Sequence, residues 1–216
     1  SKDDTRNTMV RPGDRTSLME RWTPYLEKDR KIEIVKPGHL PHWHQNNKIQ
    51  FVTFRLADSL PQRKLQQWQD LKQTFEALHP QPWDEATWEL FNKQVGGSID
   101  EWLDAGEGSC CLQHEELRKI VADAIMYFNG ERYLIHSYVI MPNHVHVLLE
   151  LRNDYKLQDI VNSWKSYSAR EINQQIGTSG ALWQKEFFDR IVRNQQHYDK
   201  ISYYIQHNPD HLVEGS

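Results

Sequence analysis

The most informative stretch of this chain is Tyr138-Val139-Ile140-Met141-Pro142-Asn143-His144-Val145-His146-Val147-Leu148-Leu149-Glu150. Apolar runs of strand length at 138–140 and 147–149 flank a Met-Pro-Asn break, which predicts a turn between two strands. Residues two apart on a strand point to the same face. His144 and His146 are therefore predicted to lie side by side above a sheet, either as half of a metal site or as two ordinary half-buried side chains.

Other candidate metal ligands are weaker. His42 and His44 also form a His-x-His pair, but residues 37–47 are rich in Pro, Gly and Asn and predict a loop leading into a strand, with nothing to fix both rings. Cys110 and Cys111 are adjacent, and the Cα spacing of neighbours disfavours a disulfide between them. Two cysteines alone cannot complete a four-ligand zinc site, so we expect them to be packing residues.

The composition is that of a globular protein with one domain and a generous insertion, or with two small domains. The chain has 216 residues and 25.7 kDa, with 38% hydrophobic and 26% charged residues, enough for a packed core. No apolar run approaches the about 18 residues of a membrane span, and the start of the chain has no signal-peptide pattern. We expect a cytoplasmic protein without membrane contact.

The net charge of −4 and the pI near 6.2 argue, taken alone, against a nucleic-acid partner. The distribution of the charge weakens that argument. Residues 61–135 hold 7 Lys and Arg against 13 Asp and Glu, whereas residues 1–60 hold 11 against 8. The acidity is concentrated in one segment, so the charge does not exclude a nucleic-acid partner.

The hydrophobic periodicity predicts alternating strands and helices. In chain order they are a strand at 49–56, helices within 62–128, the two strands around His144, a helix at 157–176, a strand at 187–192 and a helix at 196–207. This order predicts an α+β fold, a ferredoxin-like (split βαβ) antiparallel sheet of four to five strands with helices on one face, plus a helical insertion.

The last predicted helix offers a phenol and an amide on one face. Tyr204 and Asn208 are four residues apart, hence neighbours on a helix surface, and Ile201 and Ile205 form an apolar stripe that would hold the helix on the sheet. A simpler interpretation remains open for both. Tyr204 can be a core or surface aromatic, and Asn208 can be a helix C-terminal cap before Pro209.

With these residues the chain resembles the single-tyrosine HUH transposases (IS200-like), and among them the REP-associated tyrosine transposases. The resemblance spans roughly residues 49–209. It rests on five motifs in the family's order: Phe51-Val52-Thr53-Phe54-Arg55-Leu56, Met141-Pro142-Asn143-His144-Val145-His146-Val147-Leu148-Leu149, Trp164-Lys165-Ser166-Tyr167, Leu182-Trp183-Gln184-Lys185-Glu186-Phe187-Phe188-Asp189-Arg190 with Ile191-Val192-Arg193, and Tyr204-Ile205-Gln206-His207-Asn208-Pro209.

The resemblance implies a metal-dependent transposase or endonuclease acting on single-stranded DNA with hairpins. A divalent ion, Mg²⁺ or Mn²⁺, would be held by His144, His146 and the side chain of Asn208. Tyr204 would form a covalent 5′-phosphotyrosine and release a free 3′-OH, and attack of a 3′-OH on that link would transfer the strand. Whether the protein acts as a monomer or a homodimer stays open.

Tyr203 is the rival nucleophile. Its side chain is expected to point about 100° away from that of Tyr204 around the helix, and it lies five residues from Asn208 rather than four. We therefore expect Tyr203 to pack or to contact DNA. We interpret His207 as an exposed residue of this helix and His136 as a structural residue of a strand.

The predicted DNA contacts are basic and aromatic residues near the motifs. Basic side chains would bind phosphates and aromatic rings would stack on unpaired bases. The alternative is that they are core aromatics and solvated basic residues. The candidates are Trp164, Lys165, Tyr167, Trp183, Lys185, Arg190 and Arg193.

The predicted domain organisation is an N-terminal extension at 1–48, a tyrosine transposase domain at 49–209 with the helical insertion at about 61–130, and a C-terminal tail at 210–216. Two other functions stay open. One is a catalytically silent protein that binds hairpin DNA, domesticated from a transposase. The other is a metal phosphodiesterase that uses water, which should have further Asp or Glu ligands near the histidines, and Glu150 alone is a poor candidate for one.

Overall fold

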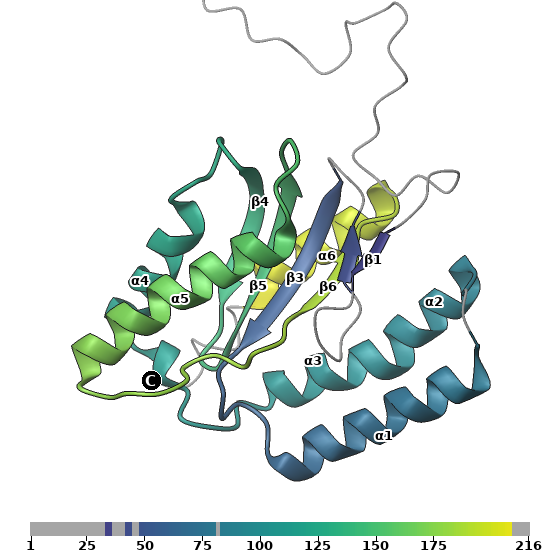
Figure 1. Ribbon diagram of the computed structural model, residues 1–216, viewed down its shortest axis with the longest axis horizontal. Helices are drawn as coiled ribbons and strands as arrows, with labels where there is room; N and C mark the ends of the chain where they lie inside the picture. The colour runs from purple at the N-terminus through teal and green to yellow at the C-terminus, as the bar shows by residue number, and fades with distance from the viewer. Residues whose placement is uncertain (1–32, 36–41, 45–47, 81–82, 209–216) are drawn as a thin grey trace, which may run out of the picture.

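A four-stranded antiparallel sheet forms the centre of the computed structural model (Figure 1). The structure describes residues 33–35, 42–44, 48–80 and 83–208, so most of the predicted N-terminal extension and the whole predicted tail at 210–216 lie outside the described residues. The strands stand in the order β4-β5-β3-β6. Their bounds are β3 (Ile49–Arg55), β4 (Tyr133–Ile140), β5 (His144–Leu151) and β6 (Phe188–Ile191).

This strand order is that of a split βαβ fold. From β3 the chain passes through α4 (Glu115–Met126) to the edge strand β4, and β5 then returns between the two. A second crossover through α5 (Leu157–Ile176) leads to β6 on the other edge. The predicted α+β class and the ferredoxin-like antiparallel sheet are confirmed.

The two faces of the sheet are covered by different helices. Helices α4 and α5 pack on the face that includes Val145, Val147 and Leu149, whereas α6 (Gln195–His207) packs on the face that includes Leu148. Figure 1 shows α5 in front of the sheet and α6 behind it. The prediction of helices on one face therefore holds for α4 and α5 but not for α6. Strand β5 is buried on both faces, so helices must pack on both sides of the sheet.

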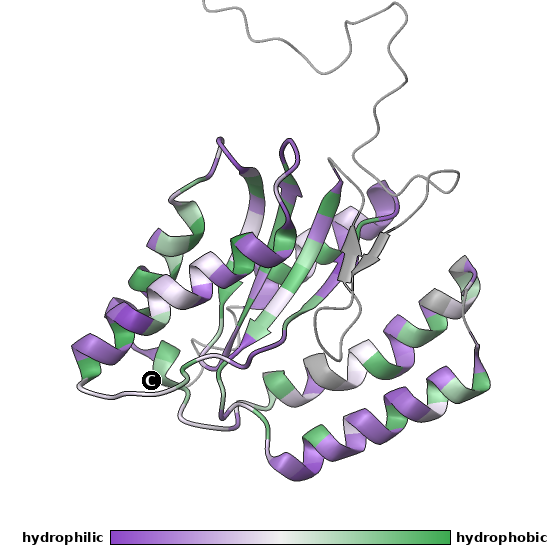
Figure 2. Cartoon of the chain, viewed as in Figure 1, coloured by the Kyte–Doolittle hydropathy of each residue, from purple (hydrophilic) through white to green (hydrophobic). Residues whose placement is uncertain are grey.

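The predicted helical region at about 61–130 divides into two parts. Residues 62–104 form a helical hairpin with an apolar cluster of its own, beside the β6 edge, where Trp68 packs edge-to-face on Phe188 at 5.4 Å. Helix α4, from the same region, instead packs on the sheet. The hairpin consists of α1 (Gln62–Leu78), α2 (Glu85–Phe91), the π-helical turn η1 (Asn92–Gly96) and α3 (Gly97–Asp104). Figure 2 shows mixed polar and apolar bands along α1 and α5, as expected of helices with one buried side.

A small second sheet pairs β1 (Glu33–Val35) with β2 (His42–His44). The loop predicted over the second His-x-His pair is thus wrong for residues 42–44, because a strand from another part of the N-terminal region pairs with them. Such pairing has no local sequence signal. None of the described helices is both long and apolar enough to cross a membrane.

Helix α6 should separate from the sheet when its apolar contact is reduced. Ile205 is 2% exposed between α6 and the sheet, and replacing a buried Ile by Ala costs about 2–5 kcal/mol. We expect Ile205→Ala to speed amide exchange in α6 more than in β5, measured by hydrogen exchange with mass spectrometry. Ile176→Ala, at a position that is 44% exposed, is the control and should change neither element. Equal acceleration in α6 and β5 would contradict a separately held α6.

Candidate active site

The structure brings the two predicted histidines together at the start of β5. Both side chains are fully buried, and their Nε2 atoms lie 3.0 Å apart. Each imidazole also has a partner at Nδ1. For His144 it is the Asn143 Oδ1 atom at 2.7 Å, and for His146 it is the Thr53 hydroxyl at 2.7 Å. With both Nδ1 atoms occupied, the two Nε2 atoms face one point.

Burial keeps the pair uncharged. It lowers the pKa of His144 to about 3, and it lowers the pKa of His146 well below its usual range, with electrostatic repulsion from His144, when that ring is protonated, and from Arg190 acting in the same direction. A neutral imidazole keeps a lone pair for a metal ion, whereas an imidazolium does not. The pair is thus in the protonation state that a metal site requires at neutral pH.

Helix α6 brings Tyr204 to the same point. The helix begins after Asn194, whose side chain accepts a hydrogen bond from the backbone N–H of His197 at 2.9 Å. The buried Ile201 and Ile205 hold it on the sheet. The half-buried Tyr204 phenol oxygen lies 3.3 Å from the His146 Nε2 atom. A phenol and two imidazoles of one chain therefore converge.

Asn208 follows α6 directly and is 5% exposed. Its backbone N–H donates to the Tyr204 carbonyl, so it does occupy the cap position considered above. Its side-chain Nδ2 is buried without a hydrogen-bond partner. A flip of such an amide exchanges its nitrogen and oxygen, and the oxygen is the atom that a divalent cation would prefer.

The histidine pair has the spacing of two ligands on one octahedral ion. With bonds of about 2.1 Å at right angles, two ligand atoms lie about 3.0 Å apart, which is the separation of the two Nε2 atoms. No cluster of three or more His, Cys, Asp or Glu side chains suited to a metal occurs within the part of the chain that the structure describes. The two imidazoles are therefore the side chains whose spacing fits an ion here, and the Asn208 amide stays a predicted third ligand.

Two arginines lie on the same face of the sheet. Arg190, on β6, is placed with its guanidinium 4.6 Å from the Phe51 ring centroid, and that ring stacks on His146 at 5.3 Å. Arg55 is the cross-strand partner of His144. Burial lowers the pKa of Arg55 to about 10, against the opposing effect of the Glu186 carboxylate, so it stays charged at neutral pH.

The sequence assigned no role to Arg55 or Thr53. They are two apart on β3, and the antiparallel register sets them opposite His144 and His146. The sequence predicts that Thr53 and Arg55 share one face of their strand, but it does not predict which residues of β5 lie opposite them.

Several residues that the sequence predicted to contact DNA do not lie beside the two histidines. Trp164 and Trp183 are 2% and 6% exposed in the core on the opposite face of the sheet, and the Lys165 amine donates to the Lys185 carbonyl at 2.8 Å. These positions favour the alternative of core aromatics. The Arg193 guanidinium pairs with Glu89.

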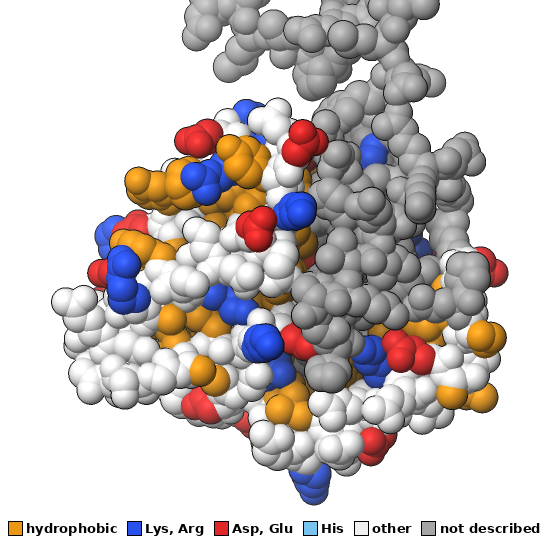
Figure 3. Space-filling view, in the orientation of Figure 1, with side chains coloured by type: hydrophobic (Ala, Val, Ile, Leu, Met, Phe, Trp, Pro, Cys, Tyr) orange, Lys and Arg blue, Asp and Glu red, His pale blue; other side chains and the backbone are white. Residues whose placement is uncertain are grey.

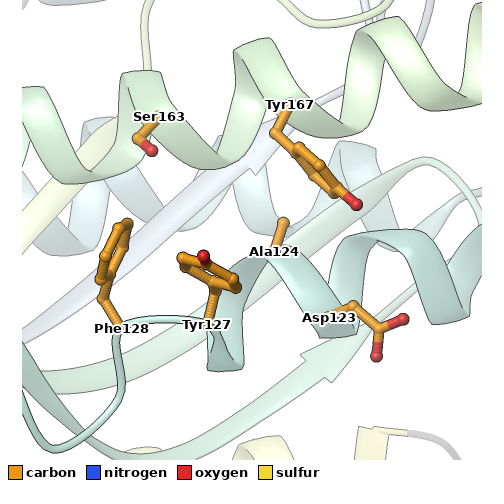
Figure 4. Close-up of a pocket in the computed structure, with 6 residues that line it drawn as sticks. All are labelled: Asp123, Ala124, Tyr127, Phe128, Ser163 and Tyr167. Atoms are coloured by element: carbon orange, nitrogen blue, oxygen red, sulfur yellow. The ribbon is translucent and has the colours of Figure 1, made fainter.

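Tyr167 is 44% exposed and borders a hollow of ≈ 350 Å³ between α4 and α5 (Figure 4). Because α4 and α5 cover the opposite face, this hollow is separated from the histidines by the sheet. Figure 3 shows acidic and basic side chains interspersed on this side of the molecule. The hollow is lined by Asp123, Ala124, Tyr127, Phe128, Ser163 and Tyr167.

Comparison with known proteins finds a similarity in the C-terminal part of the chain. The family model described as "Transposase IS200 like" matches residues 113–208, from before α4 to Asn208, and includes both histidines and Tyr204. No curated protein is detectably similar to the chain.

Two solved structures are similar at low identity. One is a REP-associated tyrosine transposase bound to a REP hairpin, with 15% identity and a TM-score of 0.44, over 80% of this chain and 73% of that one. The other is a transposase candidate from Deinococcus radiodurans R1, with 17% identity and a TM-score of 0.35, over 76% of this chain and 93% of that one.

His197 on α6 should make the stability of the protein depend on pH. Burial, followed by the charges of Arg190, Arg193 and Lys200, lowers its pKa from 6.5 to about 4. Between these values the unfolded chain binds a proton that the folded chain does not, so the contribution is fully present above pH 6.5 and is lost as the pH falls towards 4. Urea unfolding across this range should show stability falling with acid.

His197→Gln should reduce the slope of that dependence. The imidazole Nδ1 accepts from the Arg193 backbone N–H at 3.3 Å, and a glutamine oxygen can replace that acceptor without titrating. A slope that is unchanged in the variant would show that His197 is not one of the groups responsible.

Proposed function

We propose that this chain, which is similar to the family model "Transposase IS200 like" over residues 113–208, is a metal-dependent enzyme that cleaves and rejoins single-stranded DNA through a covalent 5′-phosphotyrosine. The observation that carries the proposal is the convergence of Tyr204, His146 and His144. The phenol oxygen is 3.3 Å from one Nε2 atom, which is 3.0 Å from the other. A nucleophile and two neutral metal ligands can thus reach one phosphate.

Tyr204 would attack the scissile phosphorus with its phenol oxygen. The bond from phosphorus to the 3′-oxygen breaks, a phosphotyrosine forms on the 5′ side, and the leaving 3′-oxygen takes up a proton from solvent to become a 3′-OH. Because the side chain is half-buried rather than enclosed, its proton can pass to solvent. One phosphoester replaces another, so a 3′-OH can reverse the step and rejoin or transfer the strand.

His144, His146 and the Asn208 amide would hold Mg²⁺ or Mn²⁺. When bound, the ion polarises the scissile phosphate and neutralises developing negative charge. Arg190, beside Phe51 and His146, and Arg55, opposite His144, would add fixed positive charge on the same face of the sheet. Single-stranded DNA with hairpins is the proposed substrate, as the sequence motifs imply.

Tyr204→Phe should abolish cleavage and the covalent protein–DNA adduct. The substitution removes only the phenol oxygen, so folding and DNA affinity should change little. Tyr203→Phe is the matched control, because Tyr203 is 64% exposed and stacks on His207 at 3.8 Å on the outer side of α6. The measurement is an SDS- and heat-resistant gel shift with labelled single-stranded hairpin DNA from the flanks of its own gene and Mn²⁺.

The same assay separates the other functions. A water-using phosphodiesterase would release cleaved DNA from the wild-type protein without an adduct, and a silent hairpin-binding protein would give neither product. If the adduct persisted in Tyr204→Phe and disappeared in Tyr203→Phe, the assignment of the nucleophile would be wrong although the reaction class would stand.

His144→Ala and His146→Ala should each remove Mn²⁺ binding and cleavage while hairpin binding remains. Loss of an outer partner of a metal ligand already costs about 10–100-fold in affinity, and loss of the ligand itself should cost more. Titration followed by the EPR signal of free Mn²⁺ measures this. His114→Ala, on an exposed residue before α4, is the control. Cleavage that persists in EDTA would exclude the metal role.

A further inference from the structure

The turn before β5 is held from three sides. The Asn143 carbonyl accepts from the Leu56 N–H at 2.8 Å, at the end of β3. The Pro142 carbonyl accepts from the Leu112 N–H at 3.1 Å, in the short 3-10 turn η2 (Cys111–Gln113). The third side is the Asn143 side chain itself, which is 1% exposed and reaches the end of α3. The residue beside His144 is thus a junction between the sheet and the helical hairpin.

The amide of Asn143 can have only one orientation. One of its polar atoms faces two backbone carbonyls, those of Leu103 at 3.2 Å and Glu107 at 3.0 Å. Carbonyl oxygens accept and do not donate, so the atom that faces them is the amide nitrogen. The amide oxygen then faces the His144 Nδ1 atom at 2.7 Å.

This orientation determines the tautomer of His144. An amide oxygen cannot donate, so Nδ1 of the imidazole must carry the hydrogen. In the neutral ring the lone pair is then on Nε2, the atom that lies 3.0 Å from the His146 Nε2. A metal-binding imidazole needs this arrangement, in which the outer nitrogen donates to an acceptor and the inner one binds the ion.

The Leu103 carbonyl can face Asn143 because α3 ends here, and the Glu107 carbonyl belongs to the loop that follows. Gly106 has a positive φ of 68°, and its N–H donates to the Leu103 carbonyl at 3.0 Å, which closes the helix. The last carbonyls of a helix have no partner within it, and the Asn143 amide caps one of them. The loop is also tied to α1, because the Lys64 amine pairs with the Glu107 carboxylate at 2.7 Å.

We propose that the helical hairpin of residues 62–104, with its following loop to Glu107, is a positioning element of the metal site. Through the Leu103 and Glu107 carbonyls it orients Asn143, and through Asn143 it holds His144 with its Nε2 lone pair towards His146. The inference rests on the proposed function in one respect, that His144 is a metal ligand. It assigns the acidic insertion a role in the reaction without any contact with DNA.

The tautomer can be measured without metal. In protein labelled with ¹⁵N-histidine, long-range ¹H–¹⁵N spectra distinguish an Nδ1–H ring from an Nε2–H ring, and His144→Gln identifies the signal. We expect His144 in the metal-free wild type to be the Nδ1–H tautomer. Asn143→Ala should shift it to a mixture with the Nε2–H form and weaken Mn²⁺ binding about 10–100-fold.

A pair of glycine variants tests the hairpin itself. Gly106 and Gly177 each follow a helix, each have φ of 68°, and at neither would an added Cβ meet an atom within 4 Å. Gly106→Val and Gly177→Val therefore introduce similar backbone strain, but only the first lies beside the carbonyls that hold Asn143. We expect Gly106→Val to alter the His144 tautomer and weaken Mn²⁺ binding about 10-fold, and Gly177→Val to change neither.

The outcomes separate this inference from the proposed function. An Nε2–H tautomer in the wild type, or equal Mn²⁺ affinity in wild type, Asn143→Ala and Gly106→Val, would overturn the positioning role and leave the transposase proposal standing. Wild-type protein that binds no Mn²⁺, but whose Nδ1–H tautomer is lost in Asn143→Ala and Gly106→Val, would support the positioning role and contradict the metal site.

Discussion

The antiparallel pairing of β3 with β5 is the interaction on which the site depends. Its register sets Thr53 opposite His146 and Arg55 opposite His144. A shift of one residue would turn both histidines to the face that α4 and α5 cover. The register is strongly specified because the two buried sides of β5 differ. An exchange of its two sets of side chains would bury the imidazoles in the apolar layer under α4 and α5, away from their partners at Nδ1.

The two faces of the sheet therefore have different chemistry. Under α4 and α5 the core is largely apolar, and one of its polar groups, the Trp183 indole N–H, donates to the Ser168 hydroxyl at 3.0 Å. Under α6 the sheet buries two imidazoles, and a buried polar group is costly unless it has a partner. Thr53 and Asn143 supply those partners at the Nδ1 atoms. The remaining nitrogens face each other, which is the arrangement that a shared cation would complete.

Helix α6 orients its two neighbouring tyrosines differently. Tyr204 turns inwards to His146, whereas Tyr203 stacks on His207 in solvent. The phenol and the histidines belong to one chain here, so a single molecule contains a complete set of the proposed groups. The helical hairpin and its following loop contact Asn143, beside His144, through the Leu103 and Glu107 backbone carbonyls. Both carbonyls lie outside residues 113–208, which the family model matches.

The sequence by itself determined the elements whose cause is local periodicity. A period of two put His144 and His146 on one face, a period of 3.6 grouped Tyr204 with Asn208 and distinguished Tyr203, and the order of strands and helices predicted the ferredoxin-like sheet. Contacts between distant segments were decided only by the tertiary structure. The placement of α6 on the opposite face and the burial of Trp164 depend on how distant segments pack on the sheet. The contact of the hairpin with Asn143 depends on backbone carbonyls. A backbone carbonyl is the same in every residue, so no pattern of side chains predicts which carbonyl will face the turn that contains Asn143.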